Sequence, residues 1–112
     1  MVYLCTTTTK IDKFKNGGNR CNHSHFKFEV SQFPIFEEAC VIDFDEKPYA
    51  IEIDRLLSSK ADIEIKGKLD DNTLRMIYKR LQQSGSLSYV EMLDIYESFN
   101  NCGITGLKRP KR

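Results

Sequence analysis

Residues 40–54 read CVIDFDEKPYAIEID, and this stretch decides which fold the chain is expected to adopt. Apolar and charged side chains alternate on both sides of the central Asp45-Glu46-Lys47-Pro48, which is the pattern of two strands joined by a turn. We therefore expect a β-hairpin here. Its apolar face would consist of Cys40, Ile42, Phe44, Tyr49, Ile51 and Ile53.

The opposite face of this hairpin is expected to be acidic. Four carboxylates alternate with the apolar set, so they would point to the same side of the sheet, and two more precede the hairpin. These six residues are Asp43, Asp45, Glu52 and Asp54 in the hairpin, and Glu37 and Glu38 before it. Carboxylates held this close repel one another, a cost that a folded protein usually offsets with a cation or a complementary partner.

Strand patterns also occur on both sides of the hairpin. Residues 2–9 are apolar and then β-branched, and residues 26–31 alternate between apolar and polar side chains. Between them, the Asn-Gly-Gly-Asn run at 16–19 predicts a turn, because Gly and Asn accept positive φ at little cost. Residues 62–68 alternate again, with Ile63 and Ile65 inward, and are expected to form a further strand.

After residue 70 the apolar period changes to that of amphipathic helices. A first helix is expected to end at Gly85, and Ser88 with Glu91 forms the S-x-x-E capping box of a second. The sequence therefore predicts an α+β fold, in which a small antiparallel sheet of three to four strands packs against a C-terminal two-helix hairpin. Residues 1–105 would form this single domain, and residues 106–112 a basic, flexible tail.

The charge of the chain is unevenly distributed, although its 112 residues carry a net charge of only +1. Residues 36–72 hold five basic and eleven acidic groups, whereas the segments before and after them are net basic. The apolar run after Met1 is far shorter than the roughly 7–15 residues of a signal peptide. No stretch approaches the ~18 apolar residues of a membrane span. We therefore expect a cytoplasmic protein with reduced cysteines and no membrane partner.

The stretch CNHSH, at residues 21–25, holds both histidines of the chain. If it is extended, Cys21, His23 and His25 share one face with Cα atoms about 6.5–7 Å apart, which suits zinc ligation. A structural zinc site needs four ligands, however, and only Cys5, Cys40 or a carboxylate is left to complete the set. The sequence thus favours a polar loop without a cofactor, and a zinc-binding module is the alternative.

Three functions compete for the acidic face, the plainest being that it is only a solvated surface. A second is a metal-dependent nuclease, because an upstream Asp followed by Glu64-Ile65-Lys66 is loosely similar to the D…E-x-K signature of restriction-type nucleases. No helix is expected before the hairpin, although that fold would require one.

The third function is protein binding, because a rigid acidic face can bind a basic protein surface and block it. Small cytosolic inhibitors of nucleases, including immunity proteins and antitoxins, work on this principle. We expect an inhibitor of this kind rather than an enzyme, with a basic partner such as a nuclease toxin. The basic residues are not interleaved with aromatic ones along the sequence, which argues against direct nucleic-acid binding.

Overall fold

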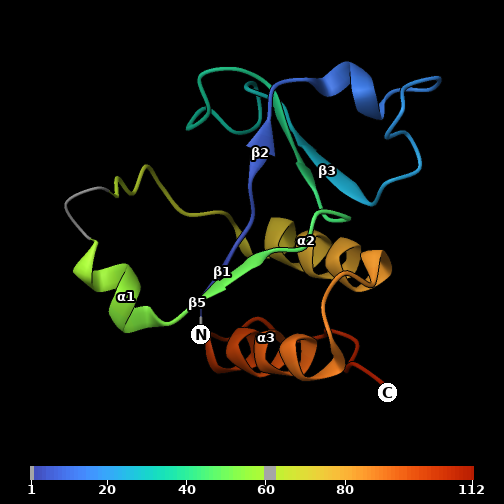
Figure 1. The fold of residues 1–112 in the computed structure, drawn as a ribbon. Helices are drawn as coiled ribbons and strands as arrows, with labels where there is room; N and C mark the ends of the chain where they lie inside the picture. The colour runs from blue at the N-terminus through green and yellow to red at the C-terminus, as the bar shows by residue number, and fades with distance from the viewer. Residues whose placement is uncertain (1, 60–62) are drawn as a thin grey trace.

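The computed structural model describes residues 2–59 and 63–112, and it has the predicted α+β architecture (Figure 1). Its strands, within these residues, form one sheet of three strands and one of two, both antiparallel. The strands are β1 (Val2–Leu4), β2 (Thr7–Thr8), β3 (His25–Phe28), β4 (Cys40–Asp43) and β5 (Tyr49–Ile51). The helices are the 3-10 helix η1 (Ile11–Phe14), α1 (Ile53–Ser58), α2 (Asp71–Ser84) and α3 (Tyr89–Asn101).

Strand β4 is the central strand of the three-stranded sheet, whose order is β2-β4-β3. Ile42 is paired with Thr7 of β2 on one side and with Phe26 of β3 on the other. All four residues of β4 are buried, so both faces of this strand are covered. A strand in such a position is expected to be apolar nearly throughout, which explains the run Cys-Val-Ile at its start.

The expected hairpin of residues 40–54 is wrong, because β4 and β5 lie in different sheets. Strand β5 pairs with β1 instead, with Leu4 opposite Tyr49 and Val2 opposite Ile51. The N-terminal segment therefore supplies a partner to both halves of the stretch, β1 to β5 and β2 to β4. Residues 44–48 leave the ladder between the two pairings, and the fully buried Phe44 turns into the core there.

Two further strand predictions are wrong, one at its C-terminal end and the other throughout its described residues. Ile53 and Asp54 begin helix α1, which follows Glu52 in an extended conformation. Residues 63–68 are irregular and pair with no strand, and Asp62 lies outside the described residues. A short alternating pattern forms a strand only where a neighbouring strand offers its hydrogen bonds, and none reaches these segments.

The predicted helical hairpin is confirmed. Asp70 caps α2, because its carboxylate accepts hydrogen bonds from the hydroxyl and the backbone N–H of Thr73, and these bonds lower the pKa of Asp70. Gly85 ends α2 at a φ of 65°, in the left-handed region that favours glycine. Ser88 and Glu91 form both hydrogen bonds of the capping box that begins α3.

The core lies between the three-stranded sheet and the helical hairpin (Figure 1). Its least exposed large side chains are Phe28 of β3, Phe44 and Tyr78 of α2. Leu87, together with Met92 of α3, completes this layer from the helical side. Among the helices of the described residues, none combines the length and the apolar character needed to cross a membrane.

The basic C-terminal segment lies against the two helices. The carbonyl oxygen of Lys108 accepts hydrogen bonds from the Tyr78 hydroxyl at 2.7 Å and from Gln82 Nε2 at 3.0 Å. Ile104 and Pro110 are buried on either side of this point. The expected flexibility of residues 106–112 stays a prediction, and these contacts oppose it.

A hydrogen bond from Tyr3 to Asp94 fastens the two-stranded ribbon to α3, with 3.0 Å between the hydroxyl oxygen and Oδ2. Burial, with the neighbouring carboxylate of Asp94, raises the pKa of Tyr3 to about 12. Because this folded-state pKa lies above the ordinary value of 10.0, the contribution of this group to stability is complete below pH 10 and is lost as the pH rises toward 12.

We therefore predict that Tyr3→Phe lowers the free energy of unfolding by about 1 kcal/mol at pH 7, the usual value of one such hydrogen bond. The variant should also lose less stability than the wild type between pH 10 and pH 12, as measured by urea unfolding. Tyr49→Phe is the matched control, because Tyr49 is 61% exposed, and it should behave like the wild type. Identical pH profiles for Tyr3→Phe and the wild type would contradict the anchoring role.

Candidate functional site

Asp43, the last residue of β4, is buried with only 6% of its surface exposed. The expectation that it faces solvent is therefore wrong, and the reason is the chain between β2 and β3. This segment passes over the outer face of the three-stranded sheet, where Phe14 of η1 is buried and lies 5.1 Å from the ring of His25. Ile11, Phe14 and Val41 together line a cavity of only about 80 Å³ at this contact.

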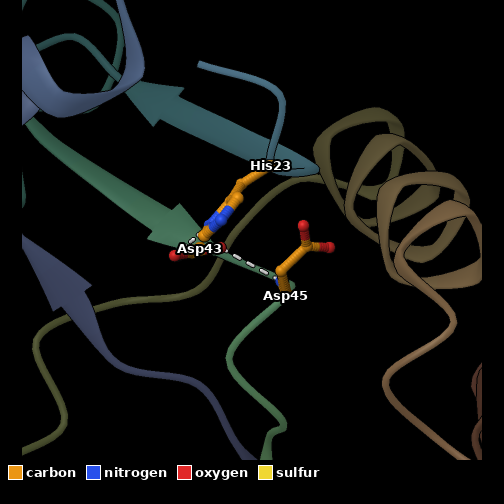
Figure 2. A group of neighbouring side chains, drawn as sticks. All are labelled: His23, Asp43 and Asp45. Carbon is orange, nitrogen blue, oxygen red and sulfur yellow. Dashed lines mark hydrogen bonds and ion pairs between the residues drawn. The ribbon is translucent and has the colours of Figure 1, made fainter. Parts of the chain in front are cut away.

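Both carboxylate oxygens of Asp43 are occupied by donors. Oδ2 accepts from Arg20 Nη1 at 3.1 Å and lies 2.9 Å from His23 Nδ1, while Oδ1 accepts from the backbone N–H of Asp45 at 3.1 Å. Figure 2 shows the ring of His23 lying on Asp43 and the link from the main chain of Asp45. The same Nη1 of Arg20 reaches Glu46 at 3.0 Å. The buried charge is thus compensated and hydrogen-bonded, as a charge in such a position must be.

The hydrogen bonds of the two histidines also fix the positions of their protons. A carboxylate and a carbonyl oxygen can only accept, so Nδ1 of His23 carries the proton that faces Asp43. Nδ1 of His25 lies 2.7 Å from the backbone oxygen of His23 and carries a proton for the same reason. The stretch CNHSH therefore uses one ring nitrogen of each histidine, Nδ1, within the fold.

The remaining acidic candidates do not form one sheet face. Asp45 is exposed in the turn after β4, Glu52 precedes α1 and Asp54 lies in its first turn. Glu37 and Glu38 are exposed in the loop between β3 and β4, where Glu37 lies 3.8 Å from the ammonium group of Lys66. The single acidic face fails because it required β4 and β5 to pair.

A metal site can be tested on the same geometry. His23, Asp43 and Asp45 each offer a ligand atom, and these atoms lie within 4.8 Å of one another. The guanidinium of Arg20 already contacts Asp43, however, so a divalent cation would meet a positive charge there. Cys21 and His25 do not join this group. The donor set fits an internal ion-pair network better than a zinc site.

The structure also does not bring together the residues that the nuclease alternative requires. Glu64 and Ile65 are exposed in the irregular segment before α2, and Lys66 lies beside Glu37. Within residues 2–59 and 63–112, the group close enough to hold a metal ion does not include Glu64. The Glu64-Ile65-Lys66 triplet and the carboxylates of the expected hairpin are therefore not assembled into one site.

Exposed apolar side chains, which the sequence pattern did not reveal, make up part of the surface of the ribbon and of α1. Because the Tyr3 side chain reaches α3, its neighbours Val2 and Leu4 point to the other face of the ribbon. None of residues 53–58 is buried, and Figure 1 shows α1 projecting away from the helical hairpin. We call this surface the apolar arm. It consists of Leu4 and Tyr49 on the ribbon and Ile53 and Leu57 on α1, which are 40–61% exposed.

One sequence signal could have found the arm. Ile53 and Leu57 are four residues apart, which places them on one face of a helix. The strand expected at residues 49–54 places Ile53 in the core, and the helical spacing of Ile53 and Leu57 is then not apparent.

Comparison with known proteins adds no family. A scan against protein-family models gives no match, and searches of the curated proteins and of the solved structures give none either. We therefore infer function from the surfaces of this chain itself.

We predict that Asp43→Asn lowers the free energy of unfolding by about 1–3 kcal/mol, because the amide has one acceptor oxygen where the carboxylate has two. Either the backbone N–H of Asp45 or the donors of Arg20 and His23 would then face an NH₂ group at this buried position. Asp45→Asn is the matched control, since its side chain is exposed, and it should change stability by no more than about 0.5 kcal/mol. Urea unfolding monitored by circular dichroism measures both. Equal effects of the two variants would show that Asp43 is not a structural centre.

Proposed function

We propose that this protein is cytoplasmic and that it binds a basic protein and neutralises it, in the manner of immunity proteins and antitoxins that block nuclease toxins. The observation that carries this proposal is the apolar arm, with carboxylates beside it. The partner class is the one expected from the acidic middle of the sequence. The proposed binding surface is the arm and not the sheet face expected from the sequence. Asp43 is excluded from the partner-binding residues because it is buried.

The exposure of the arm supports a role in binding. Single exposed apolar residues are common, but Tyr49, Ile53 and Leu57 are each more than half exposed within nine residues of chain. Exposed apolar groups gathered on one surface mark binding sites on many proteins. Protein interfaces combine such an apolar centre with a polar rim, and tyrosine is one of the residues that most often dominate their binding energy.

The charges beside the arm indicate the partner. Glu46 is paired with Arg20 and Lys47 with Glu91, so these groups are already neutralised. In the described part of the chain, Asp45, Glu52 and Asp54 form no ion pair and are exposed. Unpaired negative charge around an apolar centre steers association toward a positively charged surface.

The test uses two pairs of variants as bait in the native host. Glu52→Lys combined with Asp54→Lys reverses the charge of the arm, and Asp71→Lys with Glu97→Lys is the control with the same change of net charge on α2 and α3. Glu52 makes no capping hydrogen bond, so its replacement should leave α1 intact.

The second pair tests the apolar centre. Tyr49→Ala with Leu57→Ala removes exposed apolar groups from the arm, and Ile65→Ala with Val90→Ala removes them elsewhere.

We predict that a basic protein is captured by the wild type and by both controls, and that its affinity for each arm variant falls by at least about 30-fold, the loss typical of an interface hot spot. Affinity is measured by calorimetry with the purified partner, whose activity should be blocked at an equimolar ratio. An acidic partner, equal binding by all variants, or a self-association of the wild type that Tyr49→Ala abolishes would each overturn the proposal.

A further inference from the structure

A hollow of about 510 Å³ lies between the C-terminal segment and the connection from α2 to α3. This volume falls within the roughly 300–1,000 Å³ of small-molecule sites. Leu87 and Met92 line it with apolar groups, Tyr89 adds an aromatic ring, and residues 108–112 form its rim. We call it the basic hollow, because four of those five rim residues are lysine or arginine.

The charge of this hollow is not compensated. In the described residues, none of the side chains that line it is a carboxylate, and none of the four rim side chains with a positive charge takes part in an ion pair. A concave surface with charges of one sign focuses its potential and raises the local concentration of the opposite ion. The ligand that this potential favours is an anion.

The main chain of the rim and its two arginine side chains make contacts with the rest of the fold. The hydrogen bonds to the carbonyl oxygen of Lys108 and the burial of Pro110 fix the main chain of the rim. The guanidinium carbon of Arg112 lies 4.9 Å from the ring centre of Tyr89, and that of Arg109 lies 5.9 Å from the ring centre of Tyr96. An arginine in such a fixed orientation presents two parallel N–H groups, from which phosphate oxygens accept a pair of hydrogen bonds.

A second hollow of the same volume continues on the other side of the segment. It shares Gln82 and Lys108 with the basic hollow and adds Arg75 and Lys79. The four rim cations and these two residues therefore line adjoining hollows. Aromatic rings and basic groups that are separated in the sequence thus come together in space, an arrangement that serves nucleotide binding in many proteins.

From these observations we propose that the basic hollow binds a nucleoside phosphate. The base would lie against Tyr89 and the apolar groups, and the phosphate would be bound by Arg109, Arg112 and the lysines of the rim. A free nucleotide and a nucleotide unit of a single strand carry this same chemistry. Residues 108–112, which line the hollow, end the chain shown, and Figure 1 shows this C-terminus away from α1, so the inference is independent of the arm.

The test measures the binding of fluorescein-labelled hexauridylate by fluorescence anisotropy, and that of AMP and ATP by calorimetry. Arg109→Ala with Arg112→Ala removes two exposed cations from the rim. Lys15→Ala with Arg55→Ala is the control, because it causes the same change of net charge outside both hollows. Tyr89→Ala tests the base contact, with circular dichroism to verify the fold.

We predict that the rim variant loses at least about tenfold in affinity for the ligand that the wild type binds, while the control loses less than threefold. For hexauridylate, the slope of log K against log salt should fall by about 1.4, which corresponds to two lost phosphate contacts on a single strand. Tighter binding of hexauridylate than of AMP and ATP identifies a single strand as the source, and the reverse order identifies a free nucleotide.

Three results would overturn the proposal: no binding of any of these ligands in 50 mM salt, equal losses in the rim variant and the control, or unchanged affinity in a folded Tyr89→Ala variant. None of these results depends on whether the arm binds a protein, so the two proposals fail separately.

Discussion

The buried carboxylate of Asp43 is the constraint on which the arrangement of this protein depends. A charge in that position costs several kcal/mol unless it is paired and hydrogen-bonded. Two side chains contact this carboxylate, those of Arg20 and His23, and both come from the loop between η1 and β3. That loop therefore covers the outer face of the sheet, so β4 is buried on both faces, while β2 and β3 pair with its two edges. Because both edges of β4 are paired, β5 pairs with β1 instead, and the chain continues into an exposed arm.

The acidic residues that are close together in the sequence have different surroundings in the structure. Asp43 lies inside, Glu46 is neutralised by Arg20, and Glu37 lies near Lys66. Within the described residues, Asp45, Glu52 and Asp54 carry negative charge that no ion pair neutralises, and these three lie beside the apolar arm. The basic residues at the other end of the chain gather around a hollow instead. The two surfaces that are proposed to bind ligands thus have opposite charge and different chemistry.

The features that were predicted correctly from the sequence are those that local interactions determine. Gly85, Ser88 and Glu91 act within a few residues of their own position, and the helical hairpin they define was confirmed. Alternation in residues 40–54 could not show which strand pairs with which, because the N-terminal segment competes for both halves. An aspartate that alternates with apolar residues has the same pattern whether it is solvated or buried against an arginine. The partner of His23 lies 20 residues further along the chain, so CNHSH could not be interpreted without the fold.

The most direct test of this account is the protonation of the His23 ring, measured by long-range ¹H–¹⁵N correlation NMR at neutral pH. A proton on Nδ1 of His23, with a resonance that shifts in Asp43→Asn, is the predicted result, because only a donor can face that carboxylate. A neutral ring with its proton on Nε2 alone would contradict the account. In that case the loop would not be fastened to β4 through Asp43, and the explanation for the burial of the outer face of β4 would fail.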